Sequence, residues 1–144
     1  MVVRIEDVQF GEIRIRDEPW PYRGPEGRLY VLEFSSGWVK VGQSTSLSDR
    51  IDTLRGAFRR AHGWEITRQW SSGPLSTEKR HPNTRHAELD DAERRVLRHA
   101  RSQYFQLSDW MPTGVNGETE TFLGVSFGNL VAYTDVVVRC TGTG

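Results

Sequence analysis

The pattern of apolar and polar residues is clearest in residues 28–44. Two short segments rich in Leu, Val, Tyr, Phe and Trp lie on either side of a polar turn at residues 35–37. Such segments around a short loop with glycine predict a β-hairpin. Directly paired residues share a face of a sheet. Tyr30, opposite Gly42, should therefore point to the same side as Lys40.

A helical pattern follows this hairpin directly. Ser46 and Asp49 resemble a capping box at its start, and His62-Gly63 is the expected end. At 100° per residue its apolar positions form a narrow stripe: Leu47, Ile51, Leu54 and Phe58. Arg50 falls on the edge of this stripe, where its guanidinium can reach back over the sheet.

A second helix is expected over residues 85–102. Its apolar stripe repeats at helical spacing: Leu89, Ala92, Val96 and Ala100. On the same count Glu93 lies about 40° from Leu89, inside the stripe. An unpaired buried charge is costly, so this carboxylate needs a partner, either a metal ion or an arginine.

The remaining segments complete an α+β fold. A third strand is expected over residues 64–70, so the sheet is a small three-stranded antiparallel one flanked by helices. Residues 1–26 are expected to form an N-terminal β extension of two short strands packed on a core of residues 27–144. The type of the apolar segment 130–138, helix or strand, stays open. The whole chain is expected to form one compact domain.

Composition narrows the class of protein. At 144 residues the chain is long enough for a sizeable core. Its single cysteine, Cys140, excludes an internal disulfide and a multi-cysteine zinc site. No apolar run has the length of a membrane span, and no signal peptide opens the chain. We therefore expect a cytoplasmic protein with no membrane segment.

Charge is unevenly distributed along the chain. Residues 50–101 hold 12 Arg or Lys and 7 Asp or Glu, whereas the rest hold 7 and 12. A basic middle fits a phosphate-facing surface, and a mixed solvated surface explains it equally well. Five basic side chains of this middle segment are candidates for contact with DNA: Arg55, Arg59, Lys79, Arg80 and Arg85.

The hairpin residues carry a family resemblance. Leu29-Tyr30, nine further residues, then Lys40-Val41-Gly42, with Arg50 eight positions after the glycine, resemble the core of the GIY-YIG nuclease superfamily. Lys40 stands for the second motif tyrosine, as in the phage-type branch of that superfamily. The resemblance covers residues 27–122.

Other positions extend or depart from the family pattern. Arg28 replaces the usual first glycine, and Gln43 stands where many members have a basic residue or His. Glu93 is similar to the helical metal-binding glutamate that follows the third strand in such enzymes. Glu120, in a Glu-Thr-Phe element near the end of the resemblance, is a second candidate for the metal and otherwise has a structural role.

The resemblance implies a DNA endonuclease that hydrolyses phosphodiester bonds with one Mg²⁺ (or Mn²⁺). Tyr30 would assist attack by water, with its pKa lowered by Lys40. Arg50 would bind the phosphate oxygens, and Glu93 would hold the metal with several waters.

Two alternatives stay open: an inactive nucleic-acid-binding module of the same fold, and a protein-interaction domain with a tryptophan surface. No separate DNA-recognition domain is evident in the sequence. We therefore expect low sequence specificity, structure-selective cutting, or specificity supplied by residues 71–85 or by a homodimer.

Overall fold

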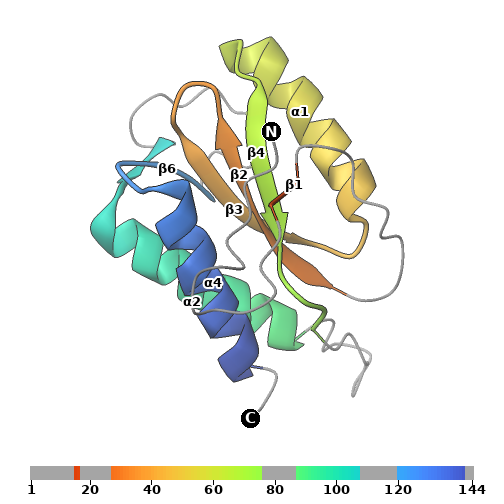
Figure 1. Cartoon of the computed structure of the whole chain (residues 1–144), viewed down its shortest axis with the longest axis vertical. Coiled ribbons are helices and arrows are strands. Elements are labelled where there is room, and N and C mark those ends of the chain that lie inside the picture. Colours follow the sequence, from red (N-terminus) through yellow and green to blue (C-terminus); the bar gives the residue numbers. More distant parts are fainter. Residues whose placement is uncertain (1–14, 17–26, 76–86, 108–119, 142–144) are drawn as a thin grey trace.

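The computed structural model describes residues 15–16, 27–75, 87–107 and 120–141. The described residues form an α+β fold in which helices pack on both faces of one antiparallel sheet (Figure 1). The strands are β1 (Ile15–Arg16), β2 (Arg28–Phe34), β3 (Val39–Ser44), β4 (Ile66–Ser71), β5 (Phe105–Gln106) and β6 (Thr121–Leu123). The helices are α1 (Leu47–His62), α2 (Ala87–Gln103) and α4 (Phe127–Thr141).

The sheet has more strands than the three expected. Its order is β1-β4-β2-β3-β6-β5. The three predicted strands, β2, β3 and β4, are its centre, and three strands of two or three residues extend both edges. Strand β1 lies within the N-terminal extension for which two short strands were expected; the rest of residues 1–26 lies outside the described residues. Strands β5 and β6 were not predicted, because strands this short carry too few residues for a period-2 pattern.

The β2–β3 hairpin has the predicted register. Tyr30 pairs with Gly42 and Leu32 pairs with Lys40. The backbone N–H of Phe34 donates to the carbonyl of Trp38 across the turn, at 2.9 Å. Gly37 in this turn has φ of 91°, a conformation that glycine adopts without strain.

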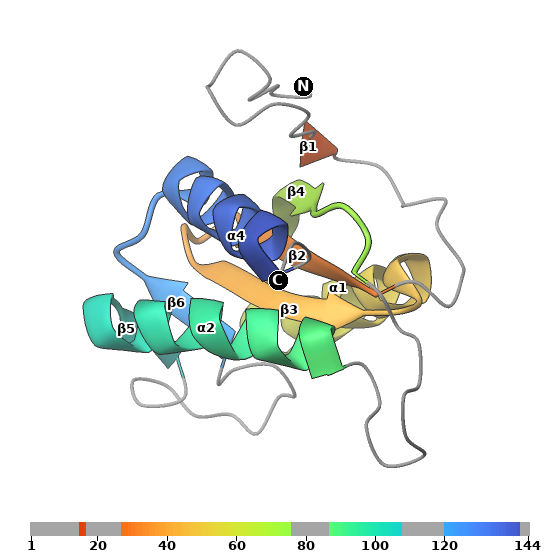
Figure 2. The ribbon, with the colours of Figure 1, turned by 90° about the horizontal axis from the view of Figure 1, so that it is seen from below.

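Alternation along the hairpin divides the core into two clusters. Leu29, Val31, Val39 and Val41 pack against α2 and α4 on one face of the sheet. Tyr30, Leu32, Phe34 and Trp38 pack against α1 on the other. Figure 2 shows α2 and α4 lying on the side of the sheet opposite to α1. The side chain of Lys40 therefore points toward α1, whereas its neighbours in β3 point toward α2.

Helix α1 has the predicted bounds but not the predicted cap. It spans Leu47–His62 and ends at Gly63, whose φ of 72° is left-handed. Ser46 occupies the N-cap position but forms no side-chain capping hydrogen bond. Instead, the hydroxyl of Ser44 accepts a hydrogen bond from the backbone N–H of Ser46, at 2.9 Å. The expected capping box of Ser46 and Asp49 is therefore wrong.

The C-terminal apolar segment is a helix. The buried residues of α4 include Phe127, Leu130, Val131, Thr134, Val137 and Val138, at helical spacing. Several of them pack in one cluster with α2, so tertiary packing decides the type that local propensity left open. Helix α2 matches its predicted range closely. No helix in the described residues is long and apolar enough to cross a membrane.

Candidate active site

A cavity lies where the outer edge of β3 is uncovered by the described strands. Strand β6 pairs with Val39 and Lys40 only, so none of the described strands pairs with the end of β3 on this side. The cavity has a volume of about 680 Å³. Its walls come from β2, β3, the start of α1, α2 and the residue before β6: Tyr30, Lys40, Gln43, Ser44, Thr45, Ser46, Asp49, Arg50, Thr53, Leu54, Leu89, Glu93 and Glu120.

All four predicted catalytic residues line this one cavity. Tyr30, Lys40, Arg50 and Glu93 come from β2, β3, α1 and α2 respectively, and Glu120 joins them. Sequence positions 63 residues apart thus meet at one sheet edge. The hydroxyl-bearing residues Ser44, Thr45, Ser46 and Thr53 also line the cavity, although the sequence did not single them out.

The Tyr30 phenol is packed against the backbone of Gly42. Tyr30 is only 2% exposed. A Cβ atom at position 42 would overlap the Tyr30 hydroxyl oxygen and lie 2.5 Å from Cζ. Only glycine leaves room for the ring here, so the motif glycine has a steric role. Burial raises the pKa of Tyr30 above its ordinary value, although Lys40 and Arg50 act in the opposite direction. Lys40 lowers the pKa of Tyr30, as expected, but burial raises it by more, so the expected net decrease is wrong.

Lys40 is a buried cation with satisfied hydrogen-bond donors. It is 1% exposed, and its Nζ donates to Glu120 Oε2 at 2.7 Å and to the Val41 carbonyl at 3.2 Å. Its Nζ lies 5.3 Å from the centre of the Tyr30 ring. Burial lowers the pKa of Lys40, but the neighbouring Tyr30 and Glu120 more than offset this and raise it. Lys40 is therefore an ammonium at neutral pH.

Glu93 is half-buried, as its place in the apolar stripe of α2 requires. Its Oε1 accepts a hydrogen bond of 3.2 Å from Gln43 Nε2, and the same nitrogen donates to Asp90 Oδ1 at 2.7 Å. Burial raises the pKa of Glu93, and the nearby Glu120 raises it further. The partner of this carboxylate is thus a neutral amide from β3, a contact that the sequence did not indicate.

The carboxylates fit a cation that uses few protein ligands. The described residues contain no cluster of three or more His, Cys, Asp or Glu side chains able to hold a metal. Mg²⁺ commonly binds through one or two carboxylates and keeps several waters. Glu93, which lines the cavity with a raised pKa, suits that role. Glu120, already paired with Lys40, is better placed as a counterion.

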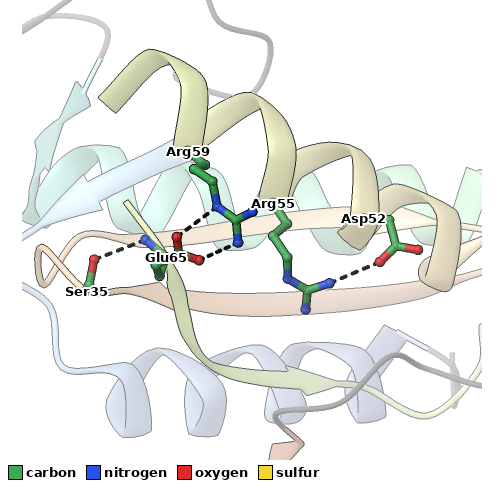
Figure 3. Close-up of polar contacts among 5 residues, drawn as sticks. All are labelled: Ser35, Asp52, Arg55, Arg59 and Glu65. Carbon is green, nitrogen blue, oxygen red and sulfur yellow. Dashed lines mark hydrogen bonds and ion pairs between the residues drawn. The ribbon is translucent and has the colours of Figure 1, made fainter. Parts of the chain in front are cut away.

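Two of the predicted DNA-binding arginines project from α1 outside the cavity. Arg55 pairs with Asp52 at 3.0 Å, and Arg59 forms a bidentate pair with Glu65 at 2.8 and 2.7 Å (Figure 3). Neither is among the cavity-lining residues. The other three candidates, Lys79, Arg80 and Arg85, lie outside the described residues.

The chain matches no protein-family model, no curated protein and no solved structure. The resemblance to GIY-YIG nucleases therefore stays a prediction from the sequence of the hairpin, α1 and α2.

Proposed function

We propose that this protein is a metal-dependent DNA endonuclease of the GIY-YIG type. One observation carries the proposal: a single cavity is lined by a phenol, an ammonium, a guanidinium and a helical carboxylate, from residues whose spacing in the sequence resembles that superfamily. Phosphodiester hydrolysis requires an activated water and stabilisation of the charge that develops on the phosphate. These four groups supply the chemistry for both requirements.

Tyr30 is the group that receives the proton of the attacking water. Its pKa is raised by burial, so it begins the reaction as a neutral phenol. Lys40 is already protonated and cannot take a proton from it. To act as the base, Tyr30 must first pass its phenolic proton to solvent water, and the Lys40 ammonium stabilises the phenolate that then accepts the proton of the attacking water.

Arg50 and Glu93 act on the phosphate from opposite faces of the sheet. Arg50, exposed in the first turn of α1, donates to the non-bridging phosphate oxygens. Glu93, held by Gln43, would be the protein ligand for Mg²⁺ or Mn²⁺. A cation held there would supply positive charge to offset the charge that develops on the leaving oxygen.

Cleavage of supercoiled plasmid with and without Mg²⁺ or Mn²⁺ tests this function. Glu93→Ala and Tyr30→Phe should each slow metal-dependent nicking by about a hundredfold or more. Glu88→Ala, on the same helix, and Tyr133→Phe, on α4, are matched controls outside the cavity lining and should nick at the wild-type rate. If Glu120→Ala abolishes nicking while Glu93→Ala does not, the assignment of the metal to Glu93 is wrong.

A nucleic-acid-binding module without catalysis is the second candidate. The raised pKa of Tyr30 favours it, because a phenol that stays neutral is a poor base. Binding of DNA by wild type without cleavage under any metal would establish this alternative. Among the tryptophans that the structure describes, Trp38 and Trp70 are buried and Trp64 stacks on Trp38, so these three give less support to a tryptophan-built protein-interaction surface.

A further inference from the structure

The amide of Gln43 joins β3 to two carboxylates of α2. Gln43 pairs with Leu29 in the hairpin, so it shares the sheet face that α2 covers. Its Nε2 donates to Asp90 Oδ1 at 2.7 Å and to Glu93 Oε1 at 3.2 Å. Asp90 and Glu93 lie three positions apart and so on neighbouring points of one helix side.

A glutamine suits this place for reasons of donor count and charge. A side-chain NH₂ group has two hydrogens, and each carboxylate takes one. The reversed amide would set its oxygen against two anions, so the hydrogen bonds fix the orientation. Because the amide is neutral, it orients the carboxylates without cancelling their charge. A lysine or arginine at this position would orient the two carboxylates but would also neutralise part of their charge.

We propose that Gln43 is a positioning residue, which fixes the Glu93 carboxylate for cation binding and uses Asp90 as its anchor on α2. The inference rests on the proposed function only for the identity of Glu93 as the metal ligand. The hydrogen bond to Oε1 limits rotation of the carboxylate about the end of a long side chain. Glu93 thus loses less conformational freedom when a cation binds.

Residues that orient a metal ligand contribute strongly to metal affinity without touching the metal. Their loss typically weakens binding about 10–100-fold. Gln43→Met keeps the length of the side chain and removes both donors. It should therefore weaken Mn²⁺ binding by a factor in this range while the fold is retained.

Mn²⁺ binding to the whole protein without DNA tests the inference, by electron paramagnetic resonance or calorimetry. Gln103→Met is the matched control, because Gln103 is an exposed glutamine at the end of α2 whose amide contacts Ser102. Wild type and Gln103→Met should bind Mn²⁺ equally, Gln43→Met about tenfold or more weakly, and Glu93→Ala not detectably. Circular dichroism confirms that each variant is folded.

A second variant separates orientation from general stability. Asp90→Asn removes the anchor's charge and should weaken Mn²⁺ binding less than Gln43→Met does. Its effect should be non-additive with that of Gln43→Met, because the two residues act through one hydrogen bond. Additive losses would overturn the role of Asp90 as anchor.

The outcomes distinguish failure of the inference from failure of the proposed function. If Gln43→Met binds Mn²⁺ as tightly as wild type while Glu93→Ala does not bind, Gln43 has no positioning role and the nuclease proposal stands. If Glu93→Ala binds Mn²⁺ like wild type, Glu93 is not the metal ligand, and the inference falls with that assignment.

Discussion

Two ion pairs of this protein have the same length and opposite surroundings. The pairs Lys40–Glu120 and Arg59–Glu65 both have nitrogen–oxygen distances of 2.7 Å. The Lys40 side chain is 2% exposed and that of Glu120 28%, whereas Arg59 and Glu65 are 55% and 52% exposed. Distance alone therefore does not describe what either pair contributes.

Exposure to solvent determines how much each ion pair contributes to the stability of the fold. Water competes for both partners of the exposed pair and screens their attraction, so each charge is solvated if the other is removed. The buried Lys40 has no such replacement, and loss of its counterion leaves a charge in an apolar environment. We therefore expect the cavity pair to matter for folding and the α1 surface pair to matter little.

Removal of each carboxylate is the most direct way to break this comparison. Glu120→Ala should lower the free energy of unfolding by about 3 kcal/mol, because it strands the buried Lys40 ammonium. Glu65→Ala, the matched control on the surface, should leave the midpoint of urea unfolding unchanged within error. Unfolding followed by tryptophan fluorescence measures both. Equal effects of the two substitutions would show that burial of Lys40 is not the deciding factor.

Substitution of Gly42 sharpens the comparison within the cavity. Gly42→Ala places a methyl group against the Tyr30 phenol, which the packed ring must move to avoid. The expected loss of stability is about 1–3 kcal/mol, with slower plasmid nicking from the displaced phenol. Gly73→Ala is the control, since a Cβ there meets nothing within 4 Å. An unfolding midpoint and nicking rate equal to wild type would contradict the steric role of the motif glycine.

The charge of Glu93 gives the smallest expected effect and depends on pH. Its pKa is raised in the folded protein, so the folded state binds this proton more tightly than the unfolded state does. The ionised carboxylate therefore destabilises the fold above the raised pKa, and this cost disappears below the ordinary pKa.

Glu93→Gln should accordingly be more stable than wild type at about pH 7 and no more stable at about pH 4, in metal-free buffer. Urea unfolding at the two pH values measures the difference. If Glu93→Gln lowers the free energy of unfolding equally at both pH values, burial of the ionised Glu93 carboxylate does not destabilise the fold. Added Mn²⁺ should stabilise wild type and not this variant.

Local patterns were enough to predict the centre of the fold and the orientation of several residues that line the cavity. The turn at residues 35–37 set the hairpin register, and alternation then placed Tyr30 and Lys40 on one face. The apolar stripe of α2 placed Glu93 toward the core, where it is half-buried. Each of these depends on neighbours within a few residues of the chain or directly across one turn.

Other features depended on packing between distant elements. The contact of Gln43 with Asp90 requires the docking orientation of α2 on β3, 47 positions away. The pairing of Lys40 with Glu120 spans 80 positions. At the start of α1, the Ser44 hydroxyl accepts a hydrogen bond from the backbone N–H of Ser46, which would donate to Asp49 in a capping box, and Ser46 forms no side-chain cap, so the expected motif does not form.

Strand β3 serves both faces of the sheet with alternate residues, Lys40 and Gly42 toward α1, Val41 and Gln43 toward α2. This restricts how the chain can change length during evolution. A residue inserted within β3 would exchange the two sets and place the ammonium beside α2 and the amide beside Tyr30. A residue inserted in the turn at 35–37 could be accommodated within the turn, without a change in the register of β3. Related chains should therefore vary in the length of this turn and keep the length of β3.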